Sequence, residues 1–523
     1  MSRYSKKRMF NLRKNKLLFI LVMFSLLYGC IFGYLKYLQY KSFFSFEWDD
    51  EASQIQIAFN TFRGNFLQQT IFIAPFCYGR FTPFIIIMAV FYLFFPYPST
   101  WFFITSFSYG FSSVLLYLLG KRILKNDHLS FLISLSFLFY APLHYANLGM
   151  AEAKTLALFP LVAVFYFLET KRFVPYIIFI IIAMSTKQDV ALVTLLIGLY
   201  CFWRRYPKRW GLTTVIVSAI YFFAANILMN TIFYTPGVDS HPEINVYAKY
   251  DLLTIKSVCI FLFTKPIQFL QHVFSLNHLR VIWLILYPVF FLPLLSLETY
   301  IALPMVMEIF LLKGFQNYNS EYIAVITPLL FIGLIYTLKK IVRIKKTKVA
   351  FLFSFIIIFL CIISNLFRNI IGDGPNETPI DQKYFVDKRF SGTTNFFDSR
   401  LYTIDTEDKA AWRLISMIPR DSSVTATGDL LMALATRRKL FSFGLNEPKA
   451  LESEYGPMDY YPAYESNYIL IHTKNLWNGL GGQYAFIDKE LANRIIEKEL
   501  VLKHNYVIIA REENLILLKK NNY

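Results

Sequence analysis

Long apolar runs alternate with polar segments, most of them short, from residue 17 to residue 366. Most of these runs are roughly 16–25 residues long, which is enough for a helix to cross the hydrocarbon core of a bilayer. The pattern therefore predicts an all-α membrane protein that crosses the bilayer many times. Twelve apolar blocks can be separated, at residues 17–35, 81–97, 100–118, 128–143, 154–168, 173–185, 190–203, 211–228, 281–297, 299–312, 321–338 and 348–366.

Composition agrees with this interpretation. The 523 residues are 56% hydrophobic and 18% aromatic, with a mean hydropathy of +0.43, whereas soluble domains are about 45–50% apolar. The net charge is +18, but the basic residues gather in short runs between apolar blocks, so membrane rather than nucleic acid is the expected partner. The five cysteines are scattered without metal-ligand spacing, so they predict neither a metal site nor a disulfide framework.

Basic residues predict the orientation of the blocks. Residues 1–16 contain seven basic side chains and no acidic one. No small-residue cleavage site follows block 17–35, so we expect a first span with a cytoplasmic N-terminus. Because cytoplasmic loops are enriched in Lys and Arg, the other basic turns should also lie on the cytoplasmic side of the cell (plasma) membrane. These turns lie at 121–125, 171–172, 204–209 and 339–348.

Twelve alternating spans would place Lys121 and Arg122 outside. One change restores agreement: block 81–97, which carries prolines near both ends, enters and leaves on the outer side or lies along it. About 11 spans then remain, with 36–99 as a large first outer loop and everything after residue 367 outside. The alternative is an ordinary twelfth span and one basic loop that breaks the rule.

The composition changes near residue 370, where glycine and proline introduce a polar stretch. We expect a transmembrane domain at 1–367, a linker at 368–404 and a soluble, extracytoplasmic α/β domain at 405–523. The local patterns in this last region predict four strands and two helices. The strands are expected at 423–426, 468–471, 507–510 and 515–518, and the helices at 406–418 and 489–499.

Polar side chains gather in the predicted outer segments. Asp50 and Glu51 follow the first span. A carboxylate held at the membrane surface can act as a general base, although the helix dipole alone also favours acidic residues at a helix start. Arg80 begins block 81–97, where a guanidinium can grip a phosphate with paired donors or reach bulk lipid headgroups.

Further candidates lie in the next two outer segments. Glu152 is in one of them, and Lys187 and Asp189 are in the other. Isolated charges at a membrane edge often only end a span, but these segments should converge on one face. Glu308 falls inside a predicted span and slightly favours a transport role; the alternative is that Lys313 in the next outer loop simply neutralises it. The sequence has no phosphate-binding glycine loop, nucleotide fingerprint or zinc spacing, which argues against ATP-driven transport and against a nucleotide-sugar donor.

These residues resemble the GT-C superfamily of membrane glycosyltransferases and, more closely, a group of bacterial and archaeal predicted multi-pass membrane proteins placed beside them. In that group an Asp precedes a Gln by six residues, Asn and Gly follow at four-residue steps, and short polar motifs recur later. The matching positions here are Asp50, Gln56, Asn60, Gly64, 80–83, 149–152, 187–189, Tyr322 and Pro328. The resemblance covers most of 45–340 and implies that Gln56 and Asn60 take part in substrate binding.

The chain also departs from that group. Two of its histidines are replaced here by Arg80 and Met150, and its glutamate by Gln188, so no metal role of those histidines is carried over. Asp50 and Glu51 together with Arg80 look similar to lipid-linked aminoarabinose and protein-mannosyl transferases. Those enzymes place an Asp-Glu pair after the first span and a basic residue before the next membrane-associated segment. The similarity implies catalysis by Asp50, with Glu51 as the next candidate.

The combined expectation is an inverting glycosyltransferase that takes a sugar from a polyprenyl-phosphate donor on the outer face of the membrane. Asp50 is the expected base, while Arg80 and Lys187 would stabilise the departing lipid phosphate. Glu152 would position the acceptor or a divalent metal ion, and the sequence specifies no other cofactor, sugar or acceptor. Two alternatives stay open: a transporter or flippase of lipid-linked sugars, and a degenerate scaffold without activity.

Overall fold

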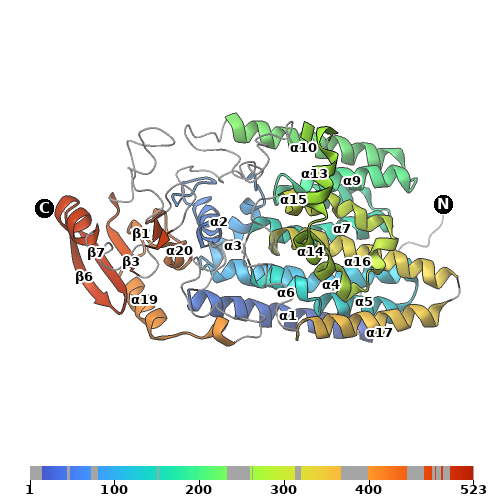
Figure 1. Ribbon diagram of the computed structural model, residues 1–523, viewed down its shortest axis with the longest axis horizontal. Coiled ribbons are helices and arrows are strands. Elements are labelled where there is room, and N and C mark those ends of the chain that lie inside the picture. The colour runs from blue at the N-terminus through green and yellow to red at the C-terminus, as the bar shows by residue number, and fades with distance from the viewer. Residues whose placement is uncertain are drawn as a thin grey trace.

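The computed structural model is a helical bundle that carries a small β-sheet at one end (Figure 1). It describes residues 15–43, 48–71, 80–149, 152–231, 260–261, 263–311, 320–344, 346–366, 399–443, 465–473, 477–478, 485–486 and 495–521. The predicted basic segment at 1–14 and most of the predicted linker at 368–404 lie outside this range.

The described part of the bundle is built from α-helices, with several 3-10 segments between them. The α-helices are α1 (Lys16–Lys41), α2 (Trp48–Asn60), α3 (Ile85–Phe94), α4 (Ser99–Leu124), α5 (Asp127–Leu138), α6 (Ala141–Leu148), α7 (Leu158–Glu169), α8 (Phe173–Ser185), α9 (Val190–Trp203), α10 (Lys208–Thr231), α13 (Pro266–Val273), α14 (Leu276–Leu286), α15 (Leu303–Leu311), α16 (Ser320–Arg343) and α17 (Thr347–Ser364). The 3-10 segments are η2 (Ala153–Ala157), η4 (Tyr287–Val289), η5 (Leu292–Leu295) and η6 (Leu297–Ala302).

Among the described residues, five helices are long and apolar enough to cross a membrane, namely α1, α4, α10, α16 and α17. A sixth span results if α5 and α6, which meet at a bend of 45°, are counted together. These helices support the prediction of a membrane protein, while the count of 11 spans stays a prediction. Pro288 and Pro293 lie in 3-10 turns that interrupt the predicted span at 281–297, because proline lacks the N–H that a continuing helix needs.

Helix α3 lies within block 81–97, which the positions of the basic turns predict not to cross the membrane. Its 10 residues extend about 15 Å, half the thickness of a hydrocarbon core. It ends at Phe95 before a proline-containing turn, and α4 starts at Ser99. Its length is therefore consistent with a segment that does not cross.

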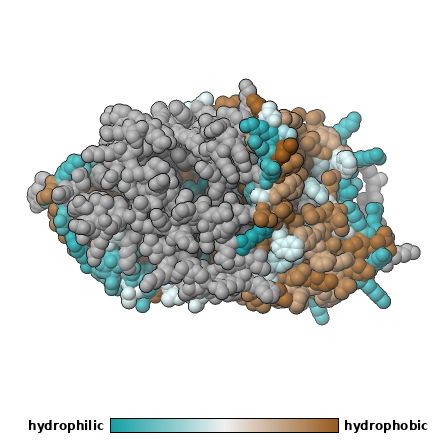
Figure 2. Space-filling model, in the orientation of Figure 1, coloured by the Kyte–Doolittle hydropathy of each residue, from teal (hydrophilic) through white to brown (hydrophobic). Residues whose placement is uncertain are grey.

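The outer surface of the bundle is apolar along helical stripes. On α10, Leu212, Ile216, Ile220, Phe223 and Ile227 are 46–65% exposed, and they recur every three or four residues on one face. Figure 2 shows hydrophobic residues around the bundle and hydrophilic residues at the end where the N-terminus lies. An exposed apolar face of this length is stable in lipid and not in water, so the bundle surface is suited to a membrane.

Helices α1 and α4 pack closely because small residues line their contact. A Cβ atom at Gly110 would collide with the backbone oxygen of Ser25. The hydroxyl groups of Ser25 and Ser113 lie 2.9 Å apart in a buried hydrogen bond. Small residues that let backbones approach, joined by polar side chains, are typical of helix pairs within membranes.

The basic turns meet at one end of the bundle. Arg204 lies 5.1 Å from the centre of the Tyr336 ring, and Lys339 lies 5.4 Å from the same ring. The hydroxyl of Tyr206 donates a 2.6 Å hydrogen bond to Glu169. The turns after α7, α9 and α16 therefore share one end, and the turn between α8 and α9, which carries Lys187, lies at the other.

The C-terminal part contains a five-stranded sheet with the order β2-β1-β3-β7-β6. Strands β1, β2 and β3 are parallel, whereas β7 runs antiparallel to both β3 and β6. The four predicted strands are all present. The sheet elements are α19 (Thr406–Ser416), β1 (Val424–Ala426), α20 (Gly428–Leu434), β2 (Leu440–Ser442), β3 (Tyr468–His472), β6 (Tyr506–Glu512) and β7 (Leu515–Lys520).

The local patterns missed two of these elements, and one predicted helix is described only in part. Helix α20 and strand β2 are short segments that were not predicted. The helix expected at 489–499 is a π-helical segment at Ile495–Lys503, and the start of its predicted range lies outside the described residues. Helix α19 begins where predicted because Asp405 caps it and forms a reciprocal capping box with Asp408.

One hydrophobic core joins the sheet to the first predicted outer loop. It includes Ile55 and Ala58 of α2, Trp101 of α4, and Leu430 and Leu434 of α20, each no more than 1% exposed. Helix α2 packs directly on α20. The loop and the C-terminal part are therefore held in a fixed relation through a shared core.

Candidate functional site

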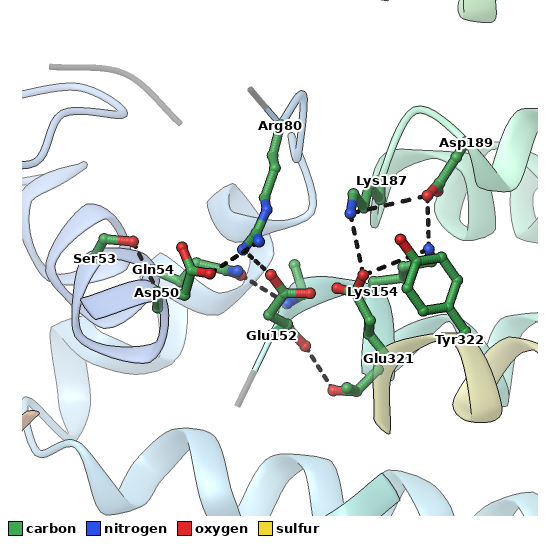
Figure 3. A network of polar contacts seen from close by, with 12 residues as sticks. Asp50, Ser53, Gln54, Arg80, Glu152, Lys154, Lys187, Asp189, Glu321 and Tyr322 are labelled. Carbon is green, nitrogen blue, oxygen red and sulfur yellow. Dashed lines mark hydrogen bonds and ion pairs between the residues drawn. The ribbon is translucent and has the colours of Figure 1, made fainter. Parts of the chain in front are cut away.

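Arg80 lies between two carboxylates from distant segments of the chain. Its guanidinium donates a 2.9 Å hydrogen bond to Asp50 Oδ2 on α2 and a second, shorter one to Glu152 Oε1 (Figure 3). Asp50 and Glu152 are 30 and 72 positions away from Arg80 in the sequence, and both contact its side chain. The expected convergence of Asp50, Arg80 and Glu152 is present in the structure.

These three residues differ in how much solvent they reach. The side chains of Arg80 and Asp50 are 19% and 24% exposed, whereas that of Glu152 is 1% exposed. Burial raises the pKa of Glu152, and the nearby Arg80 guanidinium only partly opposes that effect. Asp50 and Arg80 therefore form the open side of the site, and Glu152 forms its buried wall.

A second charged group adjoins this wall and is centred on Lys154. Its ammonium lies 2.6 Å from Asp189 Oδ2 and 3.8 Å from the carboxylates of both Glu308 and Glu321. It also lies 3.4 Å from the centre of the Tyr322 ring, a distance typical of a cation–π contact.

Lys187 joins the same group, with its ammonium 3.3 Å from Glu321 Oε1 and 3.9 Å from Asp189 Oδ2 (Figure 3). Burial opposes the ionisation of Asp189, but Lys154 and Lys187 outweigh it and hold the pKa of Asp189 below its usual value. Lys187 is 1% exposed, so it lies beneath the open side of the site. We refer to Lys154, Lys187, Asp189, Glu308 and Glu321 as the buried lysine cluster.

Backbone contacts fix the segments that carry these side chains. The N–H of Ala153 donates a 2.7 Å hydrogen bond to Gln54 on α2, and the N–H of Phe81 donates one of 2.8 Å to Gln188. The loop that holds Glu152 is therefore tied to the helix that holds Asp50. Gln188 stands at one of the positions where the chain departs from the related group, and here its amide positions the segment after Arg80.

Glu51 points away from this site. Its carboxylate is fully buried and lies 2.9 Å from the ammonium of Lys36 on α1. Lys36 also donates hydrogen bonds to the backbone oxygens of Leu148 and Gly149. The structure thus places Glu51 in a contact between α1, α2 and the end of α6, on a different side of α2 from Asp50.

Gln56 and Asn60 also lie apart from Arg80. The amide of Gln56 donates a 3.0 Å hydrogen bond to the backbone oxygen of Arg437, and that of Asn60 donates one of 3.3 Å to the backbone oxygen of Arg438. Their spacing of four residues places both on the face of α2 that meets the C-terminal part. In the structure their contacts attach α2 to the segment before β2, so they are not among the residues around Arg80.

A metal centre has no support in the part of the chain that the structure describes. Nowhere in that part are three or more His, Cys, Asp or Glu side chains arranged to hold a metal ion. The five carboxylates near Arg80 are instead in contact with Arg80, Lys154 or Lys187. Glu152 is thus suited to contact an arginine, and a divalent ion stays only an expectation from the sequence.

Sequence reasoning missed two charged residues in these contacts. Lys36 directly follows the predicted span at 17–35, but it lies inside the longer helix α1, and a buried charge within a membrane helix is a recognised sign of a special role. Glu321 was hidden because an acidic residue in the first turn of a helix such as α16 usually needs no explanation beyond the helix dipole.

Long apolar helices, lipid-facing stripes and polar ends define this chain as an integral membrane protein. It belongs to the predicted membrane protein family DUF2079, whose model matches residues 42–516. The match includes α2, the buried lysine cluster and the C-terminal sheet as far as the start of β7, so these parts belong to one family unit. No curated protein matches the chain.

Proposed function

We propose that this protein is a GT-C-type glycosyltransferase that moves a sugar from a polyprenyl-phosphate donor to an acceptor at the surface of the membrane. The observation that supports this most is the meeting of Asp50, Arg80 and Glu152 at a partly open position. A base, a phosphate ligand and a buried acid are the groups that such a transfer needs at headgroup depth.

Each residue has a role in the proposed reaction. Asp50 accepts the proton of the acceptor hydroxyl while that oxygen attacks the anomeric carbon. Arg80 stabilises the negative charge that develops on the departing lipid phosphate. Glu152 holds Arg80 in place between turnovers, and Lys187 and Asp189 support Glu152 from the buried lysine cluster. A single displacement of this kind inverts the configuration of the sugar.

The proposed orientation places the site outside the cell. Four basic turns lie at the end of the bundle opposite Lys187 and Glu152, and Lys and Arg mark the cytoplasmic side. The N-terminus is then cytoplasmic and the C-terminal sheet belongs to an extracytoplasmic α/β domain. The proposal retains 11 spans with α3 as a segment that does not cross, because this arrangement keeps every basic turn on one side.

Asp50→Asn is the direct test of the proposed base. The amide keeps the size of the side chain but cannot accept the proton, so transfer should fall by about 10²–10⁴-fold. Donor binding and the thermal unfolding midpoint should be retained. The measurement is transfer of labelled sugar from a panel of polyprenyl-phosphate monosaccharides by purified protein in vesicles.

Asp127→Asn is the matched control, because Asp127 is 40% exposed and contacts Lys121 at the other end of the bundle. Wild-type transfer by Asp50→Asn would remove Asp50 from the mechanism.

A flippase of lipid-linked sugars is the second candidate, favoured by the carboxylate of Glu308 within α15. Glu308 lies 3.8 Å from Lys154 and accepts a 3.4 Å hydrogen bond from Tyr322. These contacts give it a role in balancing a buried lysine, which weakens the argument for transport. Lipid translocation needs no base, so a flippase would continue to move lipid when Asp50 is replaced by Asn.

A further inference from the structure

The side chains around Arg80 include more carboxylates than cations, which by itself disfavours the binding of a phosphate. The described site contains three cationic side chains, Arg80, Lys154 and Lys187, and these contact five carboxylates. Both carboxylates beside Arg80 already use its guanidinium. A lipid phosphate adds negative charge to a site that already has more carboxylates than cations, so its binding to Arg80 is favoured when it replaces a carboxylate.

Of the two carboxylates beside Arg80, Glu152 is the one whose ionised form is destabilised most when Arg80 moves to a phosphate. It is 1% exposed, and its Oε2 atom has no hydrogen-bond partner within the described part of the chain. Asp50 is 24% exposed and can be solvated when Arg80 turns away. An ionised carboxylate that is buried without a nearby counter-charge is unstable and binds a proton instead.

The other cations that face Glu152 favour its ionised form less than Arg80 does. Lys187 in the turn before α9 and Lys154 on η2 both lower the pKa of Glu152, but Lys187 also contacts Glu321 and Lys154 is held by Asp189. Asp50 on α2 adds negative charge near Glu152. Glu308 on α15 and Glu321 on α16 lie beyond the two lysines and are also acidic.

Burial raises the pKa of both Glu152 and Asp189, but the neighbouring cations leave the two pKa values shifted in opposite directions. Glu152 and Asp189 are both buried, but the pKa of Asp189 is lowered by Lys154 and Lys187, whereas the pKa of Glu152 is raised by burial despite Arg80. Glu152 is therefore the one of the two that is closer to binding a proton while Arg80 is still in place.

We propose that a lipid phosphate binds Arg80 in exchange for Glu152, and that Glu152 takes up one proton from solvent in the same step. The exchange also releases Asp50 from Arg80, so its carboxylate becomes available to the acceptor hydroxyl. When the lipid phosphate leaves, Arg80 returns to both carboxylates, and the protons on Glu152 and Asp50 return to solvent. This inference rests on the proposed function, because it assumes that the ligand of Arg80 is a lipid phosphate.

Calorimetric titration with farnesyl methyl phosphate measures this proton directly. The probe is a phosphodiester and does not titrate near neutral pH, so any proton taken up belongs to the protein. Binding enthalpies in buffers of different ionisation enthalpy should reveal uptake of about one proton per ligand at pH 7.5 in the wild-type protein. The Kd should then rise up to about tenfold per pH unit above that pH.

Glu152→Gln should bind the same probe without proton uptake and with a Kd that does not change with pH. Glu298→Gln is the matched control, because Glu298 is a buried carboxylate that contacts Tyr200 and Arg204 at the opposite end of the bundle. This control should keep the proton uptake. The wild-type titration needs no substitution, so it decides the question even if Glu152→Gln fails to fold.

Binding without proton uptake by the wild-type protein would overturn the inference and leave the proposed function standing. Uptake that persists in Glu152→Gln would also overturn it, because another group would then bind the proton. No binding of the phosphodiester by the wild-type protein would contradict the proposed function itself.

Discussion

Lys36 is a buried lysine that neutralises Glu51 and joins three segments of the chain. It lies within α1 with 3% of its side chain exposed, and Glu51, its partner on α2, is fully buried. Burying two charges is unfavourable unless they are paired and their other hydrogen bonds are made. The backbone oxygens of Leu148 and Gly149 accept those further bonds from Lys36, so three segments depend on this ammonium.

Lys36→Met should destabilise the protein by about 3–5 kcal/mol, because it removes the ammonium that balances the buried Glu51 carboxylate. Adding Glu51→Gln should recover part of the loss, since the amide carries no charge. Thermal unfolding of the purified variants in detergent would measure both changes. A single variant as stable as wild type would show that the Lys36–Glu51 pair contributes little.

The helical geometry of α2 explains why Asp50 and Glu51 have different contacts. Asp50 and Glu51 are adjacent in sequence, but successive residues on a helix point about 100° apart. Asp50 therefore reaches Arg80 while Glu51 reaches Lys36. Sequence placed both residues in the first outer loop, but only packing shows which of them lies beside Arg80.

At the scale of elements, α2 holds the open side of the site and also contacts the C-terminal part. Its Gln56 amide accepts a 2.9 Å hydrogen bond from the N–H of Thr70, and the hydroxyl of Thr70 donates one of 2.7 Å to the backbone oxygen of Leu440 on β2. The C-terminal part therefore positions the helix that carries Asp50. Gln56 and Asn60, which the sequence resemblance placed among the substrate-binding candidates, thus attach α2 to the C-terminal part.

His472 joins three elements of the C-terminal part. It stands at the end of β3, with Nδ1 2.6 Å from Asp429 on α20 and Nε2 3.2 Å from Glu407 on α19. Burial of the ring opposes its protonation, but the two carboxylates outweigh burial and raise the pKa of His472 to about 10. The folded protein therefore holds the charged imidazolium.

This contact predicts how stability depends on pH. Because the pKa is raised on folding, the stabilisation is fully present below about 6.5, the ordinary pKa of histidine, and is lost as pH rises through about 10. The thermal midpoint of the wild-type protein should exceed that of His472→Gln at pH 6.5, and the difference should shrink towards pH 10. A difference that does not change over this range would contradict the assignment.

At the scale of the whole molecule, basic turns and candidate site residues lie at opposite ends of the bundle. Helix α16 connects the two ends, with Glu321 near its start and Tyr336 near its finish. These two residues lie about 22 Å apart along the helix axis. Between the two ends, α10 exposes the apolar side chains of Leu212, Ile216, Ile220, Phe223 and Ile227, which suit a lipid environment.

Cysteine labelling tests this polarity. Cysteines introduced at Lys125 and Asp421, both exposed, should react to different extents with a membrane-impermeant maleimide in intact cells. The residue at 421 should react and the one at 125 should be protected until the membrane is opened. Equal labelling of both positions would show that the proposed orientation is wrong.

The amino-acid sequence alone determined the membrane class, the grouping of basic turns and four strands of the five-stranded sheet, β1, β3, β6 and β7. These features follow from local apolar periodicity and from charge counted along the chain. It also selected Asp50, Arg80 and Glu152, because charged residues at a membrane edge are few and conspicuous.

Only the tertiary structure decided which of the candidates meet. Contacts among Arg80, Asp50 and Glu152 depend on how α2 packs, and α2 is held by residues more than 370 positions away in sequence. The pairing of Lys36 with Glu51 and the assembly of the buried lysine cluster also join separate helices. Such contacts arise from the balance of buried charges in three dimensions, which no local pattern encodes.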